Sequence, residues 1–325
     1  MPDLQKFAEN VSIIDGPPVR VIGIPLSTRM IVVKLATGLL WVNSPVSVPL
    51  EVLDRIAASG PVRYLVAPTK LHVWRLEEWH ALFPGAELWR PPQIPNKFKC
   101  LPFAGILGDA PPHGWADDLD QLIFKGSFFI DEVFFFHKKS RTVILADFIQ
   151  NHPIAKGKPL SNALFKLAGV AYPHGGVALD IRLSFANRNL ARQSLEKLLS
   201  WDFDKLIIAH GICLEKDAKP FVERAFRWLM RWYGGSYQKV ETFLTKSAQA
   251  VKRARLKGLL VPVTIIAVFA LLGFLYVEKI KQEAGWEKEV EVDFSKAPLA
   301  SPNQAEWLKE SFVFKNREAT SLLDP

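Results

Sequence analysis

Three apolar segments of the chain are each followed, directly or after a short loop, by an imidazole or carboxylate side chain. In chain order, these side chains are His72, Asp147 and His210. The apolar segments before them have the length and composition of buried strands. Since α/β proteins assemble their sites at the carboxyl ends of strands, we predict that the three ends converge on one site. Imidazole and carboxylate groups serve both acid–base and metal chemistry, and the residues alone do not choose between the two.

A second group of acidic residues lies in the segment WADDLDQ at positions 115–121. Paired carboxylates can act as a general acid and a general base. A solvated turn, in which carboxylates cap neighbouring backbone groups, explains Asp117, Asp118 and Asp120 better, and we favour it.

The remaining sequence motifs exclude several classes of site. His174 lies in a Gly-rich loop and is expected to line the mouth of the site, whereas no role is assigned to His80, His113 and His152. The chain contains no phosphate-binding loop, dinucleotide fingerprint, nucleophile elbow or HExxH motif. We therefore exclude the enzyme classes that depend on these motifs.

The elements that must position the three side chains follow from periodicity and from turn residues. We predict two hairpins, further short strands and four helices. The hairpins join residues 30–36 to 39–43 and 128–137 to 141–147, strands are expected at 62–67, 86–89 and 205–209, and helices at 47–59, 73–83, 189–201 and after Asp217. Ser47 is expected to cap the first helix. Residues 148–188 are rich in proline and glycine and are predicted to be a largely looped insertion with one short helix.

The composition is that of a globular chain with an uneven basic excess. Its two cysteines, Cys100 and Cys213, have no metal-like spacing, so neither a disulfide framework nor a zinc ribbon is expected. The formal charge is +8. Residues 1–236 contain 28 basic and 22 acidic residues, whereas residues 237–258 contain 6 and 1. This charge distribution, directly before an apolar run, is typical of contact with a membrane surface rather than with nucleic acid.

The apolar run Leu259 to Val277, LLVPVTIIAVFALLGFLYV, contains no charged residue. As a helix it would be about 28 Å long, which is enough to span a bilayer. Six Lys or Arg residues lie within twenty positions before the run and four lie after it. By the positive-inside rule we predict a single-pass membrane protein whose main domain, residues 1–236, is cytoplasmic. The basic juxtamembrane segment is then 237–258 and the polar C-terminal tail is 278–325.

Several stretches of the chain resemble the DUF4336 family of uncharacterised proteins. In order, they are RMIVVKL, NSPV, VRYLVAPTKLHVWRLEEW, WADDLDQ, EVFFFHKKSRTVILAD, LLSWDFDKLIIAHG and FVERAFRWL. They extend from about Met30 to Trp232. The resemblance implies the αββα sandwich of the metallo-β-lactamase-like fold, but it implies no activity, because one fold carries many functions.

The metal-binding loop expected for that fold is incomplete here. Active members of the wider superfamily carry His-x-His-x-Asp-His after an early strand, which binds two metal ions. The corresponding loop in this chain, KLHVWR, keeps only His72. Lys70, Trp74 and Arg75 stand at positions where ligands would be expected. By the same resemblance, Asp147 corresponds to the bridging carboxylate and His210 to the ligand at the last strand.

Two interpretations of these three remaining ligands stay open. Two imidazoles and a carboxylate with an open position can hold one divalent metal ion such as Zn, Fe or Mn. However, the lysine or arginine of the loop would repel a cation and could pair with Asp147. The result would be a metal-free, hydrogen-bonded cluster in which Trp74 fills the space of the metal. From the sequence we favour this metal-free cluster, without a cofactor.

Two functional hypotheses follow. The first is a membrane-anchored domain with a degenerate metal site that acts as a non-catalytic binding or structural module, held by its basic segment to anionic headgroups. The alternative is a mononuclear metal-dependent hydrolase that uses His72, Asp147 and His210 on a small ester or amide. Membrane lipid is the predicted partner, and nucleic acid is not expected to bind. The sequence identifies no protein partner or small-molecule ligand.

Overall fold

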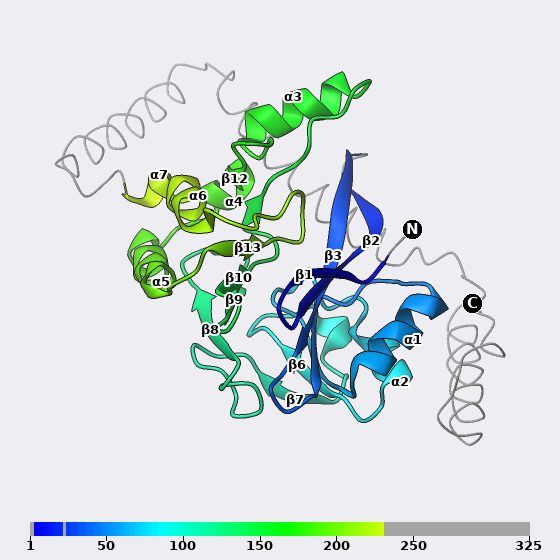
Figure 1. Ribbon diagram of the computed structural model, residues 1–325. Helices are drawn as coiled ribbons and strands as arrows, with labels where there is room; N and C mark the ends of the chain where they lie inside the picture. The colour runs from blue at the N-terminus through cyan, green and yellow to red at the C-terminus, as the bar shows by residue number, and fades with distance from the viewer. Residues whose placement is uncertain (1–2, 22–23, 231–325) are drawn as a thin grey trace, which may run out of the picture. The chain divides into compact units, whose positions relative to one another are not determined.

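A computed structural model of the protein describes residues 3–21 and 24–230 (Figure 1). These residues fall into two units. The first contains residues 3–19 and 25–227 and carries every site discussed below, and the second contributes residues 20–21, 24 and 228–230. Within the described ranges no helix combines the length and the apolar character that crossing a membrane requires. The predicted membrane helix, its basic flank and the C-terminal tail lie outside these ranges.

A seven-stranded sheet forms the N-terminal half of the fold. Its strands lie in the order β1 to β7, which are Gln5–Ala8, Val11–Val21, Ile24–Lys34, Leu40–Asn43, Val62–Val66, Glu87–Arg90 and Phe103–Ile106. β3 and β4 form the first predicted hairpin, and Gly38 in its turn has a φ of 83°, which glycine adopts without strain. Strands β4 to β7 run parallel, so their carboxyl ends lie at one edge of the sheet.

A four-stranded sheet forms the second layer, with the order β13–β10–β9–β8. Its strands are β8 (Leu119–Phe124), β9 (Glu132–His137), β10 (Thr142–Ile144) and β13 (Lys205–Ile207). β9 and β10 form the second predicted hairpin. β13 pairs in parallel with β10, with Leu206 opposite Val143. Both strands therefore end at the same edge, and burial of both sheet faces explains their continuous apolar sequences.

The two sheets pack face to face, and helices cover their outer faces (Figure 1). Between the sheets, Trp41 packs edge-on against Phe135 with ring centroids 4.8 Å apart. α1 (Leu50–Ser59) and α2 (Leu76–Leu82) cover an outer core of the first sheet. On the second sheet, beside α5 (Arg188–Ser200) and α6 (Ala218–Ala225), Phe124 stacks on Phe226. The predicted α/β class and the αββα layering are both observed.

One local prediction is wrong and another is confirmed only in part. α1 begins at Leu50 with Pro49 at its N-cap, and Ser47 does not cap it. The predicted turn with capping carboxylates is observed up to Asp118, where Asp117 is exposed, but Trp115 is only 1% exposed and the edge strand β8 begins at Leu119. Asp118 does cap a backbone group, since its carboxylate accepts the N–H of Ala36 at 3.0 Å. The amphipathic segment therefore joins the first sheet to the second.

Residues 148–188 contain more regular structure than predicted. They form β11 (Ile149–Gln150), α3 (Pro159–Ala168), β12 (Gly176–Val177) and α4 (Leu179–Leu183). β11 and β12 pair as a separate two-stranded ladder. Two helices are thus present where one short helix was expected, and the ladder brings Ile149 opposite Val177. The described chain also contains η1 (Asn96–Phe98) and α7 (Arg227–Met230).

Candidate functional site

His72 lies on a turn that follows β5, and Thr69 organises that turn. The Thr69 hydroxyl oxygen accepts the N–H of Leu71 at 3.1 Å, and its carbonyl accepts the N–H of His72 at 3.1 Å. Thr69 is fully buried, and its hydroxyl donates to Oδ2 of Asp147 at 2.7 Å. One side chain therefore fixes both the loop that carries His72 and the carboxylate that His72 faces.

Asp147 lies just beyond β10, on a loop that is held by Glu132 of β9. The Glu132 carboxyl group accepts three backbone N–H groups, from Ala146 at 2.5 Å, Asp147 at 3.0 Å and Phe148 at 2.8 Å. Glu132 is completely buried. Sequence reasoning missed this residue, although a charged residue at the start of the apolar strand EVFFFH was a usable signal. A buried carboxyl group is stable only when hydrogen-bond partners compensate for its lost hydration.

His210 follows β13 and is oriented by the first sheet. Its Nδ1 lies 2.6 Å from the carbonyl oxygen of Ser27, and because a carbonyl only accepts, Nδ1 carries the proton. The next residue, Gly211, has a φ of 107°, and a Cβ there would lie 2.2 Å from the backbone oxygen of Asn151. Glycine is therefore required at this position. Arg29 donates to the Gly211 carbonyl at 2.8 Å and further fixes the loop.

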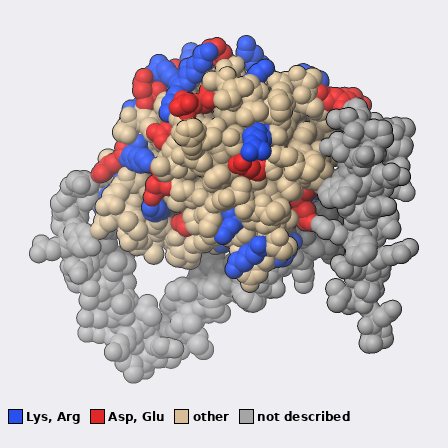
Figure 2. Space-filling view, turned by 90° about the horizontal axis from the view of Figure 1, so that it is seen from below, with Lys and Arg blue, Asp and Glu red and all other residues tan. Residues whose placement is uncertain are grey.

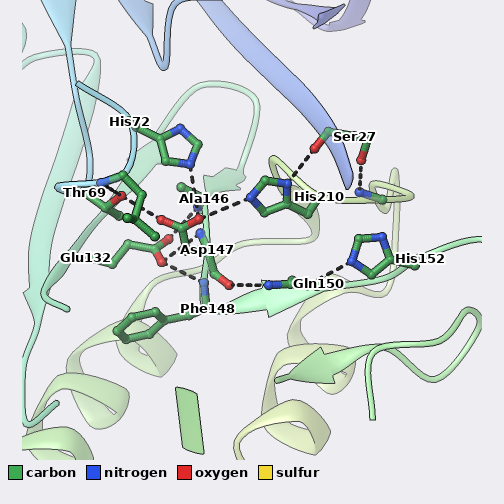
Figure 3. A network of polar contacts seen from close by, with 12 residues as sticks. Ser27, Thr69, His72, Glu132, Ala146, Asp147, Phe148, Gln150, His152 and His210 are labelled. Atoms are coloured by element: carbon green, nitrogen blue, oxygen red, sulfur yellow. Dashed lines mark hydrogen bonds and ion pairs between the residues drawn. The ribbon is translucent and has the colours of Figure 1, made fainter. Parts of the chain in front are cut away.

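The three predicted side chains converge, as Figure 3 shows. Nε2 of His72 and Nε2 of His210 lie 3.3 Å and 3.2 Å from the same oxygen, Oδ1 of Asp147. One potential ligand atom from each residue lies within 4.8 Å of the others. The side chains are 12%, 9% and 8% exposed for His72, His210 and Asp147, so little water reaches the cluster. The prediction that the three strand ends meet is confirmed.

The hydrogen bond to Ser27 decides what His210 presents to Asp147. With its proton on Nδ1, a neutral imidazole carries a lone pair on Nε2. That lone pair faces Oδ1 of Asp147 at 3.2 Å, and a carboxylate oxygen also carries only lone pairs. Two acceptors at this distance repel one another. The arrangement is therefore stable only with an additional proton or a metal cation between the two atoms.

The pKa values of the two buried carboxyl groups move in opposite directions. Burial raises the pKa of Asp147, but the facing imidazoles of His72 and His210 hold it well below its ordinary value. Burial, followed by the charge of Asp147, raises the pKa of Glu132 to about 8, against the effect of its three N–H donors. Asp147 is therefore the anion of the pair, and its charge faces the two imidazoles.

Lys70 lies beside an aromatic ring, where it makes no ion pair with Asp147. Its Nζ is 4.3 Å from the centroid of the Phe129 ring. Burial lowers the pKa of Lys70, and the charge of Asp131 opposes this shift. Among the contacts of the described residues, the hydrogen-bond partners of the Asp147 carboxylate are Thr69 and the two histidines. The expected pairing of Lys70 with Asp147 is therefore corrected.

Trp74 and Arg75 are also placed differently from the sequence expectation. The Trp74 ring packs edge-on against Phe98, 4.9 Å between centroids, in the core on the outer face of the first sheet. It therefore does not fill the space between the histidines. Arg75 forms an ion pair with Glu78 of α2 at 2.8 Å. His174 is exposed, in the loop before β12.

His152, to which the sequence gave no role, lies next to the cluster (Figure 3). Its ring stacks on Phe165 with centroids 4.2 Å apart, and its Nε2 lies 2.9 Å from Oε1 of Gln150. Burial, together with the nearby His210, lowers the pKa of His152 to about 4. His152 is therefore neutral at neutral pH. No sequence spacing indicated this position, because the insertion folds back onto the site through β11.

The donor set fits a single metal ion. Two imidazole nitrogens and a carboxylate oxygen are ligands that Zn²⁺, Fe²⁺ and Mn²⁺ accept. Bonds of about 2.1 Å in tetrahedral geometry place ligand atoms roughly 3.4 Å apart. The two distances from Oδ1 of Asp147, 3.3 Å and 3.2 Å, match this spacing. Ser27 and Thr69 also supply the outer hydrogen bonds that orient metal ligands.

We compared the chain with protein-family models, with curated proteins and with solved structures. A family model described as "Domain of unknown function (DUF4336)" matches residues 18–156. No curated protein matches the chain in sequence. Among solved structures, the flavodiiron protein from Giardia intestinalis is 16% identical, with a TM-score of 0.50 over 70% of this chain and 59% of that chain. A metallo-β-lactamase from Pontibacter korlensis is 12% identical, with a TM-score of 0.48 over 71% of this chain and 99% of that one. The DIM-1 metallo-β-lactamase is 14% identical, with a TM-score of 0.47 over 70% and 98%.

At these identities the structural likeness concerns the fold alone. The family match includes His72 and Asp147 but ends before His210, so it covers less of the chain than the sequence motifs suggested. The chain has a mixed α/β fold similar to that of the flavodiiron protein, and its residues 18–156 match the DUF4336 family model.

Proposed function

We propose that this protein binds one divalent metal ion through His72, Asp147 and His210 and uses it for hydrolysis. The observation that carries the proposal is the lone pair of His210 Nε2, which the bond from Nδ1 to Ser27 directs at Oδ1 of Asp147, 3.2 Å away. A bound metal would supply Lewis acidity and lower the pKa of a bound water. The substrate class proposed is a small ester or amide.

The chain's own groups prepare the site for a cation. Asp147 is held as an anion, and Thr69 donates to its Oδ2, which leaves Oδ1 directed at the imidazoles. The objection that a loop cation repels the metal is weakened, because Lys70 lies over Phe129 and Arg75 pairs with Glu78.

A second candidate function is the non-catalytic module with a metal-free cluster. It is favoured by the small ligand set, since Lys70 and Trp74 replace residues that would complete a dinuclear site. In this case a proton bridges His210 and Asp147 in place of the metal. The two candidates make opposite predictions for metal-dependent turnover.

The test compares chelator-stripped full-length protein before and after addition of Zn²⁺, Mn²⁺ or Fe²⁺, on chromogenic esters and anilides. The proposal predicts that one of these metals restores turnover in the wild type and in the control His113→Ala, whose side chain is exposed. His72→Ala and Asp147→Asn are expected to stay inactive. Turnover that is equal with and without metal, or equal in all variants, contradicts the proposal.

We further propose that residues 259–277 anchor the chain in a membrane with the main domain on the cytoplasmic side. The support is the uncharged 19-residue run and its basic flank. Extraction of cell membranes with alkaline carbonate tests the anchor, and protease protection of sealed vesicles tests the orientation. Release of the full chain by carbonate would contradict the anchor.

A further inference from the structure

Helix α3 turns its apolar face outward. None of its residues is buried. Leu160, Leu164 and Leu167 are 73%, 37% and 77% exposed. Their spacing of four and three residues places them on one side of the helix. A helix on the surface of a globular protein normally directs such a face toward the core, so this orientation requires an explanation outside the described fold.

The opposite side of α3 is firmly attached to the domain. Phe165 stacks on His152 with the two rings only 11° from parallel. The side-chain amide of Asn162 accepts the N–H of Ala155 at 3.1 Å and donates to its carbonyl at 2.8 Å. These contacts fix the rotation of the helix. The leucines therefore face outward because the helix is held in that orientation.

The chain segment that contains α3 carries charge of a single sign. From Phe148 to Leu179 the chain contains three lysines and no acidic residue. Lys156, Lys158 and Lys166 are all exposed, and within the described ranges none of them makes an ion pair. The face of the molecule in Figure 2, by contrast, carries basic and acidic side chains side by side.

We propose that this α3 surface, defined by Leu160, Leu164, Leu167 and the three lysines, docks on a bilayer that contains anionic lipid. A short amphipathic helix with leucines on one face and lysines beside them is the pattern of an interfacial helix. Anionic headgroups complement the lysines, whereas docking of a second copy through the same surface would place lysines against lysines. The proposal does not depend on the metal site.

The test uses the full-length protein incorporated into vesicles of equal parts phosphatidylcholine and phosphatidylglycerol. An environment-sensitive bimane probe is attached to α3 of this protein. The probe is attached at Leu164→Cys in a Cys100→Ser background, and a doxyl-labelled lipid serves as quencher. Ile106→Cys is the matched control, because Ile106 is 54% exposed on β7. The Cys100→Ser protein without a new cysteine is labelled in parallel, and its fluorescence reports how much probe reacts with Cys213.

The proposal predicts that emission from position 164 shifts to the blue and loses several-fold more intensity to the quencher lipid than emission from position 106. Exchange of the three lysines for glutamate is expected to remove most of this difference, whereas the control Lys99→Glu leaves it unchanged. Equal quenching at both positions would overturn the proposal. So would a blue shift at 164 without lipid quenching, which would mean that another part of the chain or a second copy covers the helix. Quenching that survives the lysine exchange would refute the role of anionic lipid.

Discussion

Replacement of Glu132 by glutamine tests how the loop that carries Asp147 is held. Oε1 of Glu132 accepts the N–H of Ala146 at 2.5 Å, and Oε2 accepts those of Asp147 and Phe148 at 3.0 Å and 2.8 Å. Glutamine has one carbonyl oxygen, which can take the place of Oε2 and accept the N–H groups of Asp147 and Phe148. Its NH₂ group then faces the N–H of Ala146 without a lone pair to accept it.

The expected loss follows from this single unpaired donor. A buried N–H that loses a carboxyl acceptor costs about 2–3 kcal/mol in the free energy of unfolding. Glu132→Gln should therefore unfold at a lower denaturant concentration than the wild type, measured by tryptophan fluorescence with the slope m unchanged. Because Asp147 is displaced with its loop, metal affinity should fall in the same variant.

The matched control is Glu87→Gln on the first sheet. Glu87 pairs with Arg63 at 2.6 Å, and the two side chains are 32% and 43% exposed. Loss of such a surface ion pair is expected to cost less than about 1 kcal/mol. If Glu132→Gln destabilises the protein no more than Glu87→Gln does, the role assigned to Glu132 is refuted.

Three further predictions concern residues around the site. Gly211→Ala forces a Cβ to within 2.2 Å of the Asn151 backbone oxygen at a φ of 107°, so we expect a loss of about 2 kcal/mol or more in unfolding free energy. Thr69→Val removes the hydroxyl that donates to Asp147 at 2.7 Å and should weaken metal binding about tenfold in competition with a chelating dye, whereas unchanged affinity would argue against its orienting role. The pKa of His152 is lowered from 6.5 to about 4 by burial and by a neighbouring imidazole, so the unfolded chain takes up the proton first as pH falls. Metal-free protein should therefore lose stability between about pH 6.5 and pH 4, at up to about 1.4 kcal/mol per pH unit, and the loss should be smaller in His152→Gln. Equal acid sensitivity of the two proteins would contradict this assignment.

Apolar strands that end at a polar residue were readable from the sequence. Because β10 and β13 are covered on both faces, their sequences are continuously apolar, and Asp147 and His210 mark where each segment leaves the sheet. The loop after β5 could be identified for the same reason, since it carries His72 between a strand and a helix. Local pattern was sufficient for these positions because burial itself imposes the pattern.

Contacts between distant residues were not readable from the sequence. Ser27, which sets the proton of His210, lies 183 positions away from it. The orientations of the Lys70 and Trp74 side chains depend on the aromatic rings of Phe129 and Phe98, which the fold brings next to them. From the sequence, a cation and a large ring at ligand positions suggested a blocked metal site. In the structure neither side chain blocks the space between the histidines. One short helix was expected within residues 148–188, but the bounds of α3 were not predicted, because proline and glycine at its ends resemble loop sequence.

The metal content of full-length protein, purified without added metal and measured by elemental analysis, tests the central claim most directly. We predict one equivalent of zinc, iron or manganese per chain in the wild type and in His113→Ala, and none in His72→Ala or Asp147→Asn. A wild-type protein without metal, or variants that retain it, would contradict the assignment of His72, Asp147 and His210 as a metal site.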